Sequence, residues 1–146
     1  MNQMNAVDTN ILVYAHRTEM NFHSDCLDFL QAELQIKKLA VPYHCLVEFV
    51  GICTHPKIFK TPTPMEICRM QIEMLQKAGI LILFEQSNSI ERLLSLALEA
   101  RVAGSMIHDA RIASTCIENG ISVLYSLDRD FSRFPDLKVE NPLISK

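Results

Sequence analysis

The sequence predicts an α/β domain in three layers, with helices on both faces of a central parallel sheet of four or five strands. Short apolar runs of strand length recur along the 146 residues, and longer segments with helical spacing separate them. Such alternation is typical of a parallel sheet, because parallel neighbours need a crossover connection that is usually a helix. A chain of this length can bury one core, so we expect residues 1-146 to form a single domain.

Five apolar runs are the expected strands. They lie at residues 5–8, 39–42, 80–84 and 122–127, with a weaker run at 137–140. In open parallel sheets, ligands bind beyond the carboxyl ends of the strands, at the point where the strand order reverses. We expect the order 3-2-1-4-5, which makes the first and fourth strands neighbours at that point.

Local signals mark the ends of the first expected helices. Residues 63–66 (Thr-Pro-Met-Glu) have the pattern of a capping box, with Thr63 as the N-cap and Pro64 at the first helical position. Gly79 ends this helix. His55-Pro56 ends the preceding helix, since a residue before proline is driven out of the helical conformation.

Two helices follow in the second half of the chain, each with an apolar face. The first face repeats at helical spacing and consists of Ile90, Leu93, Leu94, Ala97 and Leu98. The second helix is expected to begin at a Ser105 cap and to end at Asn119-Gly120. Its core face consists of Met106, Ala110, Ala113 and Ile117.

Composition and charge exclude several classes of protein. Apolar residues make up 49%, charged residues 21%, and the net charge is −3, which argues against a basic surface that coats nucleic acid. The sequence shows neither an apolar stretch of membrane-spanning length nor a secretion signal, so we expect a cytoplasmic protein without a membrane partner. Five cysteines without close pairing are expected to be buried and reduced; they are Cys26, Cys45, Cys53, Cys68 and Cys116.

Carboxylates follow two of the expected strands. Asp8 ends the first strand, and Asp128 and Asp130 follow the fourth. Each one alone is an ordinary turn residue, but neighbouring strands would bring all three to one edge of the sheet. Like charges gathered there are costly unless a cation neutralises them. The sequence therefore predicts a divalent-metal site at this edge.

Two more acids lie in helical segments. Glu48 stands inside the apolar run 46–50, and Asp109 lies in the first turns of the helix after Ser105. Taken alone, Glu48 is equally a solvent-facing residue of an amphipathic helix, and Asp109 complements a helix dipole. Acids on four separate elements that all point to one end of the sheet favour a common site instead.

Taken together, these motifs resemble those of the PIN-domain nucleases, and most closely the VapC toxins of type II toxin–antitoxin pairs. The resemblance runs nearly end to end and implies a PIN-like α/β/α domain. It rests on Asp8-Thr9-Asn10, Glu48, His108-Asp109-Ala110 and residues 126–131, and on the flanking segments 54–59, 131–137 and 140–143.

The resemblance implies a metal-dependent endoribonuclease. A water activated by Mg²⁺ or Mn²⁺ would hydrolyse structured RNA, either a transfer RNA or a ribosomal RNA, and leave a 5′-phosphate and a 3′-hydroxyl. These cations suit a few carboxylates with open coordination positions. Asp8 and Asp109 are the expected ligands, and Glu48 with either Asp128 or Asp130 completes the shell or orients the water.

Two polar residues are expected to support these acids by hydrogen bonds. They are Asn10 and Ser126, and the family usually has threonine at the position of Ser126, so the hydroxyl is kept. Contacts to RNA phosphates are expected from basic residues near the site, although each is also an ordinary surface charge; they are Arg17, Lys57, Lys60, Arg111, Arg129 and Arg133. Tyr14 and Tyr43 are candidates for base stacking and equally for core packing.

The resemblance also implies two protein partners. One is a VapB-like antitoxin, a segment of which occupies the acidic groove. The other is a second copy of the chain, since similar toxins form homodimers. The apolar, Met-rich segment 65–75 is a candidate for the homodimer interface.

Other interpretations stay open. A zinc site is compatible with ligand types that lack a standard spacing, at His44, Cys45, Cys53 and His55. A metal-dependent phosphohydrolase would use Asp128-x-Asp130, but it needs an aspartyl nucleophile and a lysine after a strand. A topoisomerase–primase fold leaves Asp8 and Asp109 unexplained. A PIN-like module that binds a basic partner protein without hydrolysis differs from the nuclease in the effect of replacing Asp8.

Overall fold

Five parallel strands form the sheet, in the order β3-β2-β1-β4-β5. The computed structural model describes residues 3–144. The strands are β1 Asn5–Val7, β2 Leu39–Pro42, β3 Leu81–Leu83, β4 Val123–Tyr125 and β5 Val139–Glu140. The predicted strand order is therefore confirmed. Four of the strands are shorter than expected, since their flanking residues lie outside the strand pairing.

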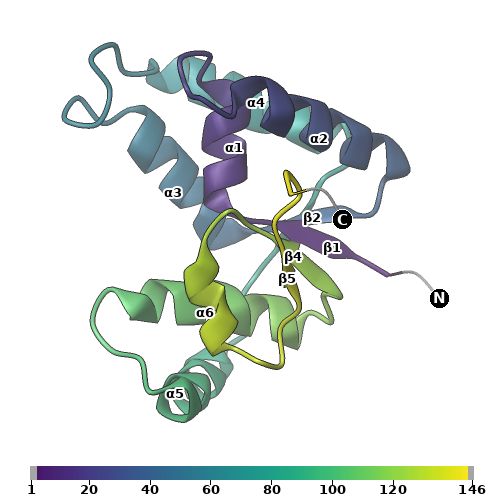
Figure 1. Cartoon of the computed structure of the whole chain (residues 1–146), viewed down its shortest axis with the longest axis vertical. Coiled ribbons are helices and arrows are strands. Elements are labelled where there is room, and N and C mark those ends of the chain that lie inside the picture. Colours follow the sequence, from purple (N-terminus) through teal and green to yellow (C-terminus); the bar gives the residue numbers. More distant parts are fainter. Residues whose placement is uncertain (1–2, 145–146) are drawn as a thin grey trace.

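Six α-helices cover the two faces of this sheet (Figure 1). On one face lie α1 Thr9–His16, α2 His23–Ile36, α3 Tyr43–Cys53 and α4 Met65–Lys77; on the other lie α5 Ser89–Ala100 and α6 Met106–Glu118. Right-handed crossovers explain this division, because the chain moves one way from β1 to β3 and the other way from β3 to β4. The three-layer α/β/α class is confirmed.

The register of the central strands sets the level of the residues that follow them. Ala6 pairs with Ala40 of β2 and with Leu124 of β4, and Val7 pairs with Tyr125. Asp8 follows Val7 directly, so it leaves the sheet beside the residue after Tyr125. β2 is buried along its whole length and Ala6 and Val7 of β1 are buried, as expected for parallel strands between helices, whereas Leu81 of the edge strand β3 is 51% exposed.

The start of α4 differs from the prediction. Pro64 is the N-cap and no side chain caps this helix, so the expected role of Thr63 is wrong. The Thr63 hydroxyl instead accepts a hydrogen bond of 2.8 Å from Arg17 Nη1 and lies 3.1 Å from His16 Nε2. A buried guanidinium thus takes the oxygen that a capping box requires. The expected end of α4 is confirmed by Gly79, which has a positive φ of 100°.

Only part of the predicted apolar face of α5 is buried. Leu93 and Ala97 face the core, whereas Ile90, Leu94 and Leu98 are 58%, 52% and 79% exposed. The helix therefore contributes a narrow core stripe and presents a second apolar row to water. Ser105 occupies the N-cap position of α6, but its side chain makes no capping hydrogen bond.

The five cysteines are buried and unpaired by disulfides, as predicted. Burial raises the pKa of each of these thiols, which keeps them protonated. Among residues 3–144, the helices are too short or too polar to cross a lipid bilayer.

Candidate active site

Asp8 lies at the junction between β1 and α1, where it caps the helix. Its backbone is extended (φ −83°, ψ 162°), and its Oδ1 accepts a hydrogen bond of 2.7 Å from the backbone N–H of Thr9. The residue is 5% exposed. An aspartate is a favoured N-cap and its charge complements the helix dipole, so the local sequence holds the carboxylate at the sheet edge.

Ser126 joins Asp8 to the segment that follows β4. Its hydroxyl donates to Asp8 Oδ2 at 2.7 Å and accepts a hydrogen bond of 3.0 Å from the backbone N–H of Asp128. Ser126 is 2% exposed. The predicted supporting hydroxyl therefore lies between two of the predicted acids, one on each of two neighbouring strands.

Thr9 connects the same centre to α3. Its hydroxyl donates to Glu48 Oε1 at 2.9 Å, while its backbone N–H donates to Asp8. Glu48 is partly exposed, with a third of its side chain in contact with water. Thr9 belongs to the Asp8-Thr9-Asn10 motif, but its role is not among those predicted from the sequence. The sequence did offer one signal for such a role: Thr9 carries a hydroxyl and stands between the predicted site residues Asp8 and Asn10.

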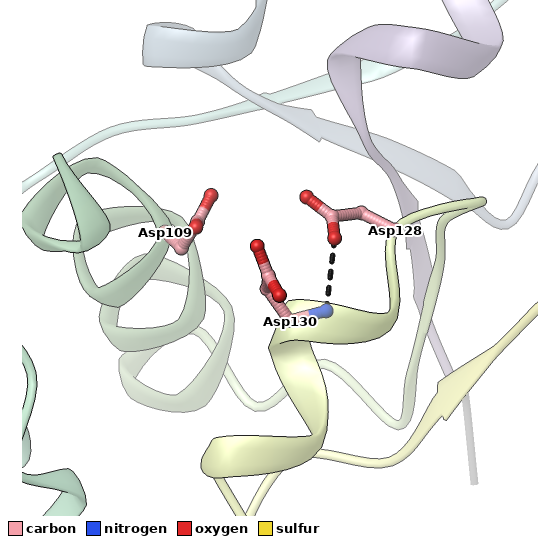
Figure 2. Close-up of side chains that lie close together, drawn as sticks. All are labelled: Asp109, Asp128 and Asp130. Carbon is pink, nitrogen blue, oxygen red and sulfur yellow. Dashed lines mark hydrogen bonds between the residues drawn. The ribbon is translucent and has the colours of Figure 1, made fainter.

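Three further carboxylates converge beside this pair. Asp109 on α6, Asp128 after β4, and Asp130 at the start of the 3-10 helix η1 (Arg129–Arg133) each offer an oxygen within 4.8 Å of the other two. Figure 2 shows the three side chains directed toward a common space, with Asp128 Oδ1 accepting a hydrogen bond of 2.8 Å from the backbone N–H of Asp130. Five predicted acids thus come from four separate segments to one edge.

The charges of neighbouring acids act on the pKa values of Asp8 and Asp109. Burial raises the pKa of Asp8 to about 6; the Ser126 and Thr9 hydrogen bonds oppose this shift, and the Glu48 and Asp128 charges reinforce it. The pKa of Asp109 is also raised to about 6, first by burial and then by the charges of the other four acids. Repulsion of this kind destabilises the ionised, metal-free site.

The donor set fits a hard divalent cation. The converging groups are carboxylate oxygens, which Mg²⁺ and Mn²⁺ prefer. A buried oxygen, Asn10 Oδ1, has no hydrogen-bond partner among the described residues and lies two positions after Asp8. No other group of three or more histidine, cysteine or acidic side chains in residues 3–144 is arranged to hold a metal. The zinc alternative therefore has no support in the described chain.

Basic and aromatic groups lie next to Glu48. His44 Nε2 lies 3.8 Å from Glu48 Oε1, and its ring stacks on His108 with centroids 5.6 Å apart. His44 Nδ1 lies 3.2 Å from Arg111 Nη1, and Arg111 forms an ion pair of 2.6 Å with Glu85. Burial lowers the pKa of His44, with Arg111 and His108 acting in the same direction and Glu48 against it.

The basic residues expected to contact RNA lie in different environments. Arg17 is buried: it bonds to Thr61, Thr63 and Glu19, and its guanidinium lies 4.0 Å from the centre of the Phe59 ring. It stands past the far end of α1, a helix of 8 residues and therefore about 12 Å long. The structure thus places Arg17 in the packing of the fold. The side chains that remain exposed are Lys57, Lys60, Arg129 and Arg133.

Comparisons with known proteins agree with this geometry. The family model for the PIN domain matches residues 6–137. Ribonuclease VapC43 of Mycobacterium tuberculosis is 30% identical over 142 residues, which is 96% of each chain. The solved structure of VapBC2 from Rickettsia felis, bound to a promoter DNA fragment, has a TM-score of 0.66 at 20% identity and covers 94% of this chain and 98% of that one.

A second solved structure shows the same fold. VapC20 of M. tuberculosis, described as a sarcin-ricin loop cleaving toxin, has a TM-score of 0.64 at 15% identity, over 87% of this chain and 92% of its own. Family match, relatives and fold agree along almost the whole sequence. The chain belongs to the PIN-domain family, and within it to the group of the VapC ribonucleases.

Proposed function

We propose that this protein is a Mg²⁺- or Mn²⁺-dependent endoribonuclease and the toxin component of a type II, VapBC-like toxin–antitoxin system. The observation that carries the proposal is the convergence of Asp109, Asp128 and Asp130 within 4.8 Å, beside the buried Asp8. Family membership among the VapC ribonucleases supports the same activity.

Asp109, Asp128, Asp130 and Asp8 are the residues that would hold the cation, with Glu48 at the margin. When bound, the cation supplies an acidified water and stabilises charge on the phosphate. Glu48 is held by Thr9 and keeps part of its carboxylate in water, which suits the orientation of an attacking water molecule. Asp128 and Asp130 differ in their hydrogen bonds. Of the two carboxylates, only that of Asp128 accepts a hydrogen bond from a backbone N–H within the turn, the N–H of Asp130.

The supporting residues set the protonation state and the orientation of the Asp8 carboxylate. Ser126 and Thr9 donate to the two oxygens of Asp8, and both bonds favour the ionised form that a metal requires. The buried Cys45 thiol lies 3.8 Å from Asp8 Oδ1. These contacts hold the buried Asp8 carboxylate in a fixed orientation.

The substrate we propose is structured RNA, a transfer RNA or ribosomal RNA. The sarcin-ricin loop named for VapC20 is the kind of target that supports this choice. Arg129 and Arg133 belong to the same short helix as Asp130 and are exposed, so they are the basic residues best placed for neighbouring phosphates. Lys57 and Lys60 lie on the loop after α3 and would contact a more distant part of the RNA.

Two protein partners complete the proposal. A VapB-like antitoxin is supported by structural relatives that are described as VapBC assemblies. A homodimer is supported by α4, where Met65, Met70 and Met74 are 61%, 53% and 59% exposed. Exposed apolar side chains repeated along one helix are typical of an interaction surface.

The test compares wild type with Asp8→Ala in cells and maps new RNA 5′ ends. We expect wild type to generate discrete new ends and growth arrest, and Asp8→Ala to generate neither while it remains folded. Asp28→Ala, which removes an exposed aspartate on α2, is the matched control and should behave as wild type. Equal cleavage by Asp8→Ala would reject this centre. Absence of cleavage by wild type, together with tight binding of a basic partner, would favour the non-hydrolytic binding module.

A further inference from the structure

Two aromatic side chains pack against one another in a tilted arrangement at the edge of the sheet, and about half of each remains exposed to water. The rings of Tyr43 and Phe84 have centroids 5.5 Å apart and planes inclined by 31°. Tyr43 is 50% exposed and Phe84 is 55% exposed. Within residues 3–144 the other comparably exposed aromatic residue is Phe22, which contacts Tyr14 at the start of α2. An exposed aromatic pair is an apolar surface available for a ligand.

The register of the sheet places this pair beside the acids. Tyr43 directly follows β2 and Phe84 directly follows β3, whose residues Pro42 and Leu83 are paired. By the register of β1 with β2, Asp8 lies level with Pro42, the residue before Tyr43. Since neighbouring strands are about 4.8 Å apart, the backbones of β2 and β3, which lead to the two rings, lie roughly 5 and 10 Å from that of β1 along the sheet edge. The adjoining nucleotide of an extended RNA strand can bridge that distance.

Arg111 fixes the pair in place. From α6 it donates to both oxygens of Glu85, at 3.0 and 2.6 Å, and it lies 3.2 Å from His44 Nδ1. Glu85 follows Phe84 and His44 follows Tyr43, so one guanidinium ties together the two segments that carry the rings. The ion pair also cancels the charge of Arg111 locally. An uncharged, preorganised aromatic surface suits the face of a nucleobase better than it suits a phosphate.

We propose that Tyr43 and Phe84 form a platform on which an unpaired base of the RNA stacks, next to the scissile phosphate. This inference rests on the proposed nuclease function and specifies its substrate. A stacked base must first leave its duplex, so the platform selects single-stranded or loop segments over paired ones. Because every base has a π-face, stacking here contributes affinity and position without requiring one particular sequence.

The first experiment measures binding without cleavage. The probe is a short single-stranded RNA carrying 2-aminopurine, with its duplex form as comparison, titrated against Asp109→Asn protein in Mg²⁺. We expect the fluorescence of the single strand to be quenched on binding and the duplex to bind more weakly. Tyr43→Ala and Phe84→Ala should each weaken binding of the single strand roughly tenfold. Tyr43→Phe keeps the ring and should bind normally.

The second experiment separates affinity from chemistry. In the otherwise wild-type chain, Tyr43→Ala and Phe84→Ala should raise KM for the single-stranded RNA roughly tenfold and change kcat little. Leu98→Ala, at an exposed apolar position on α5, is the matched control and should change neither. Thermal unfolding of each variant confirms that the fold is kept.

The outcomes distinguish the two proposals. Cleavage by wild type with unchanged KM and unchanged quenching in both alanine variants would overturn the platform and leave the nuclease intact. Neither binding nor cleavage of RNA by wild type would overturn both. Weaker binding of a purified antitoxin, with RNA binding unchanged, would assign the aromatic pair to a protein partner and overturn the stacking role.

Discussion

The Ser126 hydroxyl donates a hydrogen bond of 2.7 Å to Asp8 Oδ2 across 118 positions of sequence. It also accepts from the backbone N–H of Asp128, so a single oxygen sets the distance between the two strand ends that carry the acids. Hydrogen bonds to a charged partner are the stronger kind. The geometry of the acidic cluster, the proposed metal site, therefore depends on a neutral residue.

Replacing Ser126 tests this dependence. Ser126→Ala removes the donor that favours the ionised form of Asp8, so the pKa of Asp8 should rise further and more Mg²⁺ should be needed. We expect cleavage at neutral pH to fall on the order of tenfold, with partial recovery at higher pH. Mg²⁺ titrations at two pH values measure both effects. Ser126→Thr should retain activity, as should Ser132→Ala, which alters an exposed serine of η1; an equally inactive Ser126→Thr would contradict the hydrogen-bond explanation.

Thr9 should matter through its hydroxyl alone. Thr9→Val preserves the shape of the side chain but leaves Glu48 without its donor, so we expect reduced cleavage and a loss of about 1 kcal/mol in unfolding free energy. Thr9→Ser should behave nearly as wild type. A double-mutant cycle with Glu48→Gln measures the coupling in cleavage rate. Additive effects would show that the two residues act independently.

The metal-free protein should lose stability as the pH rises. The pKa values of Asp8 and Asp109 are raised from 3.8 to about 6 in the fold, so the folded state binds more protons than the unfolded chain between these values. Stability is then greatest below about 4 for these two groups and falls as the pH rises through about 6. The shift at the buried Asp8 corresponds to about 3 kcal/mol.

Mg²⁺ should reverse this loss, because the cation neutralises the ionised acids. We expect Mg²⁺ to raise the Tm of wild type far more at pH 7.5 than at pH 5, and to leave Asp109→Asn much less affected. Without metal, Asp109→Asn should be more stable than wild type at pH 7.5, since one repelling charge is gone. Differential scanning calorimetry measures all three; equal stabilisation by Mg²⁺ at both pH values would contradict the proposed ligands.

Arg17 should contribute to stability and not to RNA binding. Arg17→Met removes buried hydrogen bonds to Thr61 and Thr63 and the contact with Phe59, and we expect a loss of about 2 to 4 kcal/mol in unfolding free energy. KM of the folded fraction should not change. Arg133→Met is the complementary variant, with a raised KM and unchanged stability. A raised KM for Arg17→Met at full folding would restore its predicted contact with RNA.

If α4 forms the homodimer interface, a charge placed on its exposed face should lower the mass of the protein in solution from that of a dimer to that of a monomer. Met70→Glu places a charge among exposed methionines and should convert the dimer to a monomer, as measured by light scattering without antitoxin. Gln76→Glu adds the same charge at an exposed polar position of α4 and should leave the dimer intact. A monomeric wild type would remove the role proposed for this helix.

The strand order and the meeting of the acids could be predicted, because both follow from the alternation of apolar runs and from carboxylates at strand ends. Asp8 and Asp128 needed only the correct neighbours in the sheet. Contacts between helices were not predictable in this way. Nothing in the sequence shows that Arg17 takes the Thr63 hydroxyl, because the two residues meet only when α1 and the loop before α4 pack together.

The helical spacing of apolar residues in α5 also predicts more burial than the structure shows. Ile90, Leu94 and Leu98 fit the same helical face as Leu93 and Ala97, but the sheet and α6 together cover only part of α5. Similarly, the sequence makes Tyr43 a candidate for base stacking and equally for core packing. The structure places it at the sheet edge beside Phe84. Which apolar residues remain uncovered depends on how the helices tilt, and a single sequence does not contain that information.

The pairing of β1 with β4 joins the first strand of the chain to nearly the last. On the ribosome, Asp8 and Glu48 emerge early, but α5 and α6 must be made before β4 reaches its neighbour. A nascent chain therefore lacks the three aspartates that complete the centre. Any hydrolytic activity of this centre therefore requires the chain to be synthesised and folded at least through Asp130.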